Sequence, residues 1–221
     1  MADFSADLAG FDPATRYKLL TGTIVPRPIA WVTTRDAEGR NNAAPYSFFN
    51  AMSATPPVVV LGIGPRDVAG GFETKDTGRN IAERRDFVVN LVDEAHAEAM
   101  NVTAIDAPPT LDEAALAGLD LVEAEDVDAP RIATAPISFE CRLRQIVDLG
   151  EHDGARREIV IGDLLRIHAR EGVLDPETLR VDVNNYKPIG RLFGPLYARQ
   201  SDQFRMDRPN YSKWVKAQQD G

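Results

Sequence analysis

Lys75 and the residues after it carry the side chains best suited to chemistry in this chain. Residues 75–81 (KDTGRNI) have the character of a helix start, and Asp76 or Thr77 can cap it. A helix amino terminus presents unpaired backbone N–H groups and partial positive charge, which favour a phosphate. Lys75 and Arg79 add two mobile cations. The segment therefore indicates a candidate phosphate site, and an ordinary capped surface helix is the competing interpretation.

The segments around this turn read mainly as strands. Residues 27–34 are rich in aromatic and β-branched side chains, which favours a strand, and residues 36–39 supply a turn. The chain returns through residues 42–50. Residues 58–63 and 87–92 are apolar runs that predict buried strands on either side of the phosphate-site segment.

The second half of the chain continues this strand-rich order. Residues 137–149 and 158–168 predict two partner strands joined by a hairpin turn. The acidic segment 104–135 indicates an excursion that covers the sheet. The glycine- and proline-containing segment 64–71 predicts a loop. Because strands dominate in a meander-like order, the sequence favours a closed antiparallel barrel over a doubly wound sheet.

Helices are expected at the periphery. Asp12 followed by Pro13 predicts the start of a short helix that Gly22 is placed to end. Residues 93–101 form a second candidate helix. A terminal amphipathic helix is expected from Pro209 to Val215.

Several short motifs in this order resemble the flavin reductase-like family, whose members bind FMN on a split β-barrel. The matching pieces are residues 27–30 (RPIA), 44–49 (APYSFF), 56–58 (PPV), 75–77 (KDT), 80–81 (NI), 87–90 (FVVN), 161–163 (IGD) and 188–197 (PIGRLFGPLY). The resemblance extends over roughly residues 17–199. It implies a mainly β (α+β) fold, namely an antiparallel FMN-binding split β-barrel with peripheral helices.

The resemblance also implies which residues would bind FMN. The segment 27–29 would lie along the flavin, the segment 46–50 would line the ring and ribityl chain, and Lys75, Thr77 and Asn80 would reach the phosphate. The full set of implied cofactor-binding residues is Arg27, Pro28, Ile29, Tyr46, Ser47, Phe48, Phe49, Asn50, Lys75, Asp76, Thr77, Asn80, Arg191 and Tyr197. No catalytic side chain is assigned, because positioning a nicotinamide over a flavin provides most of the acceleration of hydride transfer.

Each of these roles has an alternative. Phe48 and Phe49 are consecutive, so one is expected in the core while the other can touch the ring. Asp76 either caps the helix or helps to shape the site. Arg27 is either a flavin neighbour or a surface charge. Trp31 is favoured as a core residue over a flavin-stacking one.

Two features depart from the family pattern. The family often carries a longer aliphatic residue where this chain has Gly78, which predicts a looser helix start. Related two-component reductases carry a Gly-Asp-His stretch directly before a strand, and that histidine contacts the nicotinamide. Here His152 is separated from the strand at residues 159–162, so a turn residue is the favoured interpretation.

Composition limits the remaining possibilities. The formal net charge of −9 argues against nucleic-acid and anionic-membrane partners. The single cysteine, Cys141, excludes an internal disulfide framework and reads as a small buried hydrophobe. The three histidines lack metal-ligand spacing, so no metal is expected. With no signal-peptide pattern and no apolar run near the roughly 20 residues of a membrane span, a cytoplasmic protein is expected.

The sequence therefore predicts a single domain over residues 1–221, with a core at 17–199 and a carboxy-terminal arm or helix at 200–221. The implied function is an FMN-dependent oxidoreductase that takes hydride from NADH or NADPH, with an oxygenase as a possible separate component. A non-catalytic FMN carrier or sensor and a barrel for another phosphorylated ligand are the alternatives. Family members are typically homodimers, and the arm either contributes to such a dimer or packs on its own barrel.

Overall fold

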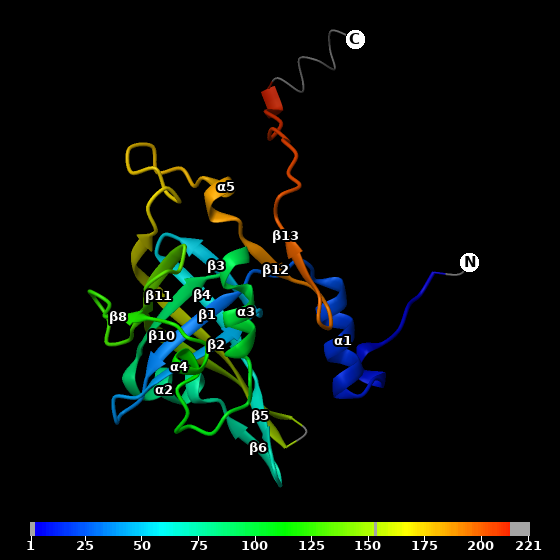
Figure 1. The fold of residues 1–221 in the computed structure, drawn as a ribbon. Helices are drawn as coiled ribbons and strands as arrows, with labels where there is room; N and C mark the ends of the chain where they lie inside the picture. Colours follow the sequence, from blue (N-terminus) through cyan, green and yellow to red (C-terminus); the bar gives the residue numbers. More distant parts are fainter. Residues whose placement is uncertain (1–2, 153, 213–221) are drawn as a thin grey trace.

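The computed structural model describes residues 3–152 and 154–212. Its centre is a seven-stranded antiparallel sheet with the order β2-β1-β7-β10-β11-β4-β3 (Figure 1). These strands are β1 (Ala30–Arg35), β2 (Asn41–Tyr46), β3 (Phe49–Ala54), β4 (Pro57–Ile63), β7 (Asp86–Leu91), β10 (Ile137–His152) and β11 (Ala155–Ala169). The smaller pairs are β5 (Pro65–Val68) with β6 (Gly71–Thr74), β8 (Leu121–Val122) with β9 (Arg131–Ile132), and β12 (Ile189–Arg191) with β13 (Tyr197–Arg199).

Short helices surround the sheet. They are α1 (Pro13–Thr23), α2 (Asp76–Arg84), α3 (Ala97–Val102), α4 (Glu113–Leu116), α5 (Val183–Tyr186) and the 3-10 helices Leu8–Gly10 and Glu94–His96. Helices α2, α3 and α4 pack beside β1 and β2, whereas α1 stands at one side next to β12 and β13 (Figure 1). None of the helices among the described residues is both long enough and apolar enough to cross a membrane.

The two edges of the sheet come together at one corner. The edge strands β2 and β3 are consecutive in the chain and are joined by Ser47 and Phe48 alone. The backbone N–H of Gly62 on β4 donates to the Phe48 carbonyl at 2.7 Å. That bond extends the β3–β4 ladder by one residue. Because only two residues join β2 to β3, the sheet curls back on itself at this corner without a ladder between them, which is the arrangement of a split barrel.

The core occupies both sides of the sheet. Inside the curl, Leu61, Phe87 and Val160 are completely buried together with Ile81 of α2. On the other side, Trp31 is completely buried against α3 and its indole N–H donates to the Thr103 hydroxyl at 2.8 Å. The assignment of Trp31 to the core is confirmed. Cys141 is also completely buried, as predicted.

The segment 64–71, predicted as a loop, is instead largely a hairpin of β5 and β6. Its ladder runs from the pair Pro65–Thr74 to the pair Val68–Gly71. Gly70 and Gly71 have φ values of 101° and 152°, so the glycines provide the tight turn instead of an open loop. Arg66 stabilises the hairpin through ion pairs with its cross-strand neighbour Glu73 and with Asp76 of α2, and sequence patterns do not reveal such contacts.

Other predicted boundaries mostly agree with the structure. The predicted partner strands at 137–149 and 158–168 are confirmed as β10 and β11, and both extend further into the hairpin turn. Asp12 caps α1 through its carboxylate, but the helix continues past Gly22 to Thr23. Of the terminal helix predicted at 209–215, the residues from 213 lie outside the described residues.

Candidate functional site

A cavity of about 460 Å³ opens where the two sheet edges meet. We call it the corner cavity, and its lining residues are Tyr17, Pro45, Tyr46, Ser47, Phe48, Gly62, Ile63, Gly64, Pro65, Lys75, Leu149, Arg157 and Glu158. Its volume falls within the range of small-molecule sites. The cavity brings together two predicted stretches that are far apart in sequence, residues 46–48 and Lys75.

The amino terminus of α2 reaches this cavity through Lys75. Lys75 is the N-cap residue, and its side chain makes no capping hydrogen bond to the helix. The prediction that Asp76 or Thr77 caps the helix is wrong, because both lie inside its first turn. Asp76 instead forms ion pairs with Arg66, at 3.1 Å, and with Arg79. The first-turn N–H groups thus lack a capping oxygen from the N-cap side chain, which leaves them available to an anion.

Lys75 is held only weakly. Its ammonium lies 3.4 Å from a carboxylate oxygen of Asp106, and the two side chains are 33% and 53% exposed. Ion pairs this open to solvent contribute little to stability. The ammonium can therefore turn toward an anion in the cavity at small cost.

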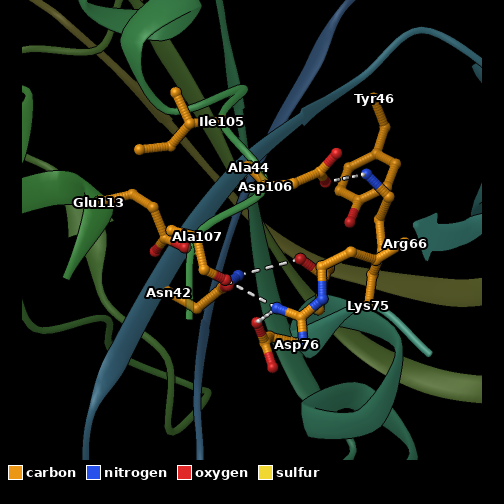
Figure 2. A pocket seen from close by; sticks show the side chains of 11 residues that line it. Asn42, Ala44, Tyr46, Arg66, Lys75, Asp76, Ile105, Asp106, Ala107 and Glu113 are labelled. Atoms are coloured by element: carbon orange, nitrogen blue, oxygen red, sulfur yellow. Dashed lines mark hydrogen bonds and ion pairs between the residues drawn. The ribbon is translucent and has the colours of Figure 1, made fainter. Parts of the chain in front are cut away.

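A second, much smaller cavity of about 30 Å³ lies behind Lys75 (Figure 2). Figure 2 shows Tyr46 and Lys75 at one side of it, with Arg66 bonded to Asp76 and to the carbonyl of Ala107. Within the described part of the chain, the buried Tyr46 hydroxyl forms no hydrogen bond of normal geometry. The space suffices for a water molecule, which would satisfy that hydroxyl.

Thr77 and Asn80 support this region from inside the protein. The Thr77 hydroxyl accepts from the Asn42 side chain at 2.9 Å, and Asn80 donates to the Thr34 hydroxyl at 3.0 Å. Both residues are almost fully buried. Thr77 lines the small cavity, whereas Asn80 lines neither that cavity nor the corner cavity.

The two phenylalanines at the corner point in different directions, as predicted. Phe48 is 46% exposed, lines the corner cavity and lies tilted against Tyr17 with ring centroids 6.2 Å apart. Phe49 packs against the buried cluster inside the curled sheet. The aromatic pair of Tyr17 and Phe48 therefore forms an apolar wall at the mouth of the corner cavity.

The remaining predicted residues of this region line a separate cavity of about 360 Å³. We call it the Arg27 cavity, and its lining residues are Pro26, Arg27, Pro28, Ile29, Phe49, Asn50, Ala51, Leu91, Val92, Phe139, Tyr186, Pro188, Ile189, Gly190 and Gln200. The structure thus divides the predicted site residues between two cavities. Ser47 and Arg27 join them, because the guanidinium Nε of Arg27 lies 3.3 Å from the Ser47 hydroxyl.

Arg27 is not a surface charge. It is only 6% exposed, and its guanidinium donates to the carbonyls of Thr21, Ile24 and Leu192 at 2.6 to 2.8 Å. Burial lowers the pKa of Arg27. The side chain fastens the end of α1 to the segment after β12, so the surface-charge alternative is wrong.

Arg191 and Tyr197 form a pair on β12 and β13. The Arg191 guanidinium lies 4.5 Å from the centre of the Tyr197 ring, a cation–π arrangement. The Tyr197 hydroxyl lies 3.4 Å from the side-chain oxygen of Asn101. Neither residue lines the corner cavity or the Arg27 cavity.

Arg157 and Glu158 line the corner cavity, and sequence reasoning missed them. They follow the β10–β11 turn, and the only sequence signal was a pair of arginines and a glutamate at the start of a predicted strand. Arg157 donates to the carbonyls of His152 and Ala155 at 2.8 and 3.1 Å. The His152 ring contacts the Leu149 carbonyl in the same turn, at 3.0 Å, and is not among the lining residues.

The sequence profile of the flavin reductase like domain matches residues 21–196 of this chain. The chain belongs to that family. The match spans both strands of the corner, helix α2 and the long β10–β11 hairpin, so it includes the whole corner cavity apart from Tyr17.

Several solved structures resemble the chain over nearly its full length. The 2-nitrobenzoate 2-nitroreductase of Pseudomonas fluorescens is 40% identical with a TM-score of 0.84, and the match covers 94% of this chain and 98% of that one. Nitrilotriacetate monooxygenase component B of Bacillus cereus is 37% identical with a TM-score of 0.85, covering 93% and 100%. A Shewanella frigidimarina protein described as having a split barrel domain matches with a TM-score of 0.75 at 16% identity, covering 91% and 96%, which shows the fold. The predicted mainly antiparallel split-barrel fold with peripheral helices is confirmed.

Proposed function

We propose that this protein is an FMN-binding oxidoreductase that uses NADH or NADPH and holds the flavin in the corner cavity. The observation that carries the proposal is the meeting of residues 46–48 with Lys75, at the uncapped start of α2, in one cavity of suitable size. The support from relatives is consistent, since the two most similar structures reported above carry a nitroreductase and a monooxygenase component in their names.

The side chains of the corner cavity match the chemical parts of FMN. Lys75 and Arg157 supply cations for a phosphate, and the start of α2 supplies N–H donors. Phe48 and Tyr17 supply an apolar wall for a flat ring, while Ser47 and the backbone of residues 62–65 supply polar contacts. The residue types therefore fit a mononucleotide with an aromatic ring at one end and an anion at the other.

The contribution of the protein would be binding and orientation. Bound FMN supplies the redox chemistry, by accepting a hydride from a nicotinamide and passing on the electrons. Lys75 and Arg157 would hold the phosphate end, and the backbone around Ser47 would fix the ring at the corner. The Tyr17–Phe48 wall, which is exposed on its outer side, would limit the faces from which a second planar molecule can approach.

The segment 27–29, Phe49 and Asn50 line the Arg27 cavity and not the corner cavity, in which we place the phosphate. We propose that these residues support the flavin site from the other side of Ser47 and that Arg191 and Tyr197 approach the flavin near the subunit interface of a homodimer. An oxygenase that receives reduced flavin is a candidate partner, in line with the component-B relative. We also propose that the whole chain forms one domain and that the protein is cytoplasmic.

A spectrum of the purified protein tests the proposal. We expect flavin absorbance after incubation with FMN and removal of excess ligand, bleaching on anaerobic addition of NADH or NADPH, and nicotinamide oxidation with free FMN in air. Binding without bleaching would favour the carrier or sensor. No binding of FMN would refute the proposed function.

A further inference from the structure

Glu158 places a carboxyl group directly beside the proposed phosphate position. It lies on β11, opposite Ile63 of β4, and lines the corner cavity. A Cβ atom on Gly78 would lie 2.6 Å from its Oε1 atom, so this oxygen rests on the first turn of α2. The absence of a side chain at position 78 is therefore what makes room for the carboxyl group.

Within the part of the chain that the structure describes, one oxygen of the Glu158 carboxyl group lacks a hydrogen-bond partner. Its Oε1 atom is inaccessible to solvent and has no hydrogen-bond partner among residues 3–152 and 154–212. Buried polar atoms without partners are rare, and this one belongs to a residue that lines a cavity able to hold a ligand.

Charged groups at the start of α2, on the β10–β11 hairpin and on the β5–β6 hairpin surround Glu158, whereas its β4 neighbour Ile63 is apolar. Lys75 at the start of α2 and Arg157 on the same strand line the cavity with it. Burial raises the pKa of Glu158; Arg156 on its own strand opposes this rise and Asp148 on β10 adds to it. Glu73 on the adjacent β5–β6 hairpin is paired with Arg66, 2.9 Å away.

Resting on the proposed function, we propose that Glu158 limits how tightly the corner cavity holds the FMN phosphate, so that FMN is an exchangeable ligand. A site that retains a phosphate permanently surrounds it with donors and cations. Here an ionised carboxylate shares the cavity with the two cations and repels a phosphate dianion. In its protonated form the same group can donate a hydrogen bond to a phosphate oxygen.

The consequence is a small difference between FMN and riboflavin, which lacks the phosphate. In its ionised form the carboxylate offsets part of the attraction of Lys75 and Arg157. The phosphate then adds little to affinity, and the flavin can leave. This behaviour suits a protein that delivers reduced flavin to a separate partner.

Titrations of FMN and riboflavin into the flavin-free full-length protein, followed by flavin fluorescence, test the inference. In Glu158→Gln we expect FMN to bind about tenfold or more tightly than in the wild type, since a close charge repulsion is removed. Riboflavin affinity should stay the same, which also shows that the variant is folded. Glu151→Gln, an exposed change in the same hairpin, is the matched control and should behave like the wild type.

A pH series adds a second readout. The ratio of FMN affinity in Glu158→Gln to that in the wild type should grow as pH rises, because only the wild type acquires the extra negative charge. Equal or weaker FMN binding by Glu158→Gln at neutral pH, with riboflavin binding intact, would overturn the inference and leave the proposed function standing. Failure of every variant to bind either flavin would overturn both.

Discussion

Replacing Lys75 by alanine tests the proposed phosphate position most directly. A hydrogen bond from a cation to a phosphate contributes on the order of 1.5–3 kcal/mol. Lys75 must first give up its ion pair with Asp106, which at 3.4 Å and with both side chains partly exposed is worth at most about 1 kcal/mol. The difference predicts a loss of about 0.5–3 kcal/mol, or roughly 2- to 150-fold in FMN affinity.

The assay is a titration of the flavin-free protein with FMN and with riboflavin. Lys75→Ala should weaken FMN binding and leave riboflavin binding unchanged, because riboflavin has no phosphate. Lys18→Ala on α1 removes an exposed lysine outside the cavity lining and is the matched control. Asp106→Ala removes the competing carboxylate and should bind FMN at least as tightly as the wild type. Unchanged FMN affinity in Lys75→Ala would refute the phosphate assignment.

Two further predictions concern the framework that holds the site. In Gly162→Ala the new Cβ would lie 2.4 Å from the ring of Phe87, so we expect the free energy of unfolding to fall by about 1–3 kcal/mol and Tm to decrease. Gly22→Ala is the control, because open space surrounds Gly22 and the change should not lower Tm. Glu140 is buried; burial raises its pKa, but two backbone N–H bonds and His168 outweigh this and hold the pKa below the ordinary value of 4.5. Because the folded-state pKa is the lower one, this stabilisation is present above pH 4.5 and is lost as pH falls below it. Glu140→Gln should therefore be less stable at neutral pH and show a flatter decline of Tm in acid, and parallel pH profiles of the two proteins would contradict this.

The sequence by itself determined where most of the long strands lie along the chain, and its resemblance to a known family implied that residues 46–50 and Lys75 meet at one ligand. Alternating and apolar runs predicted β1, β4 and β7, because strand formation depends on local residue types and on burial of one or both faces. The resemblance carried by residues 44–49 and 75–77 implied that these stretches serve one ligand, and Tyr46 to Phe48 do line one cavity with Lys75.

Only the tertiary structure decided where the charged groups of the site lie and which groups they pair with. Arg27 is buried because it meets a carbonyl of Leu192, and Asp76 is a buried ion-pair partner because the β5–β6 hairpin brings Arg66 to it. Glu158 faces the cavity because Gly78, far away in sequence, leaves space for it. Local patterns specify which face of an element is apolar. The partner of a buried charge depends instead on which other element packs against it, and that packing is fixed only when the sheet curls at the corner.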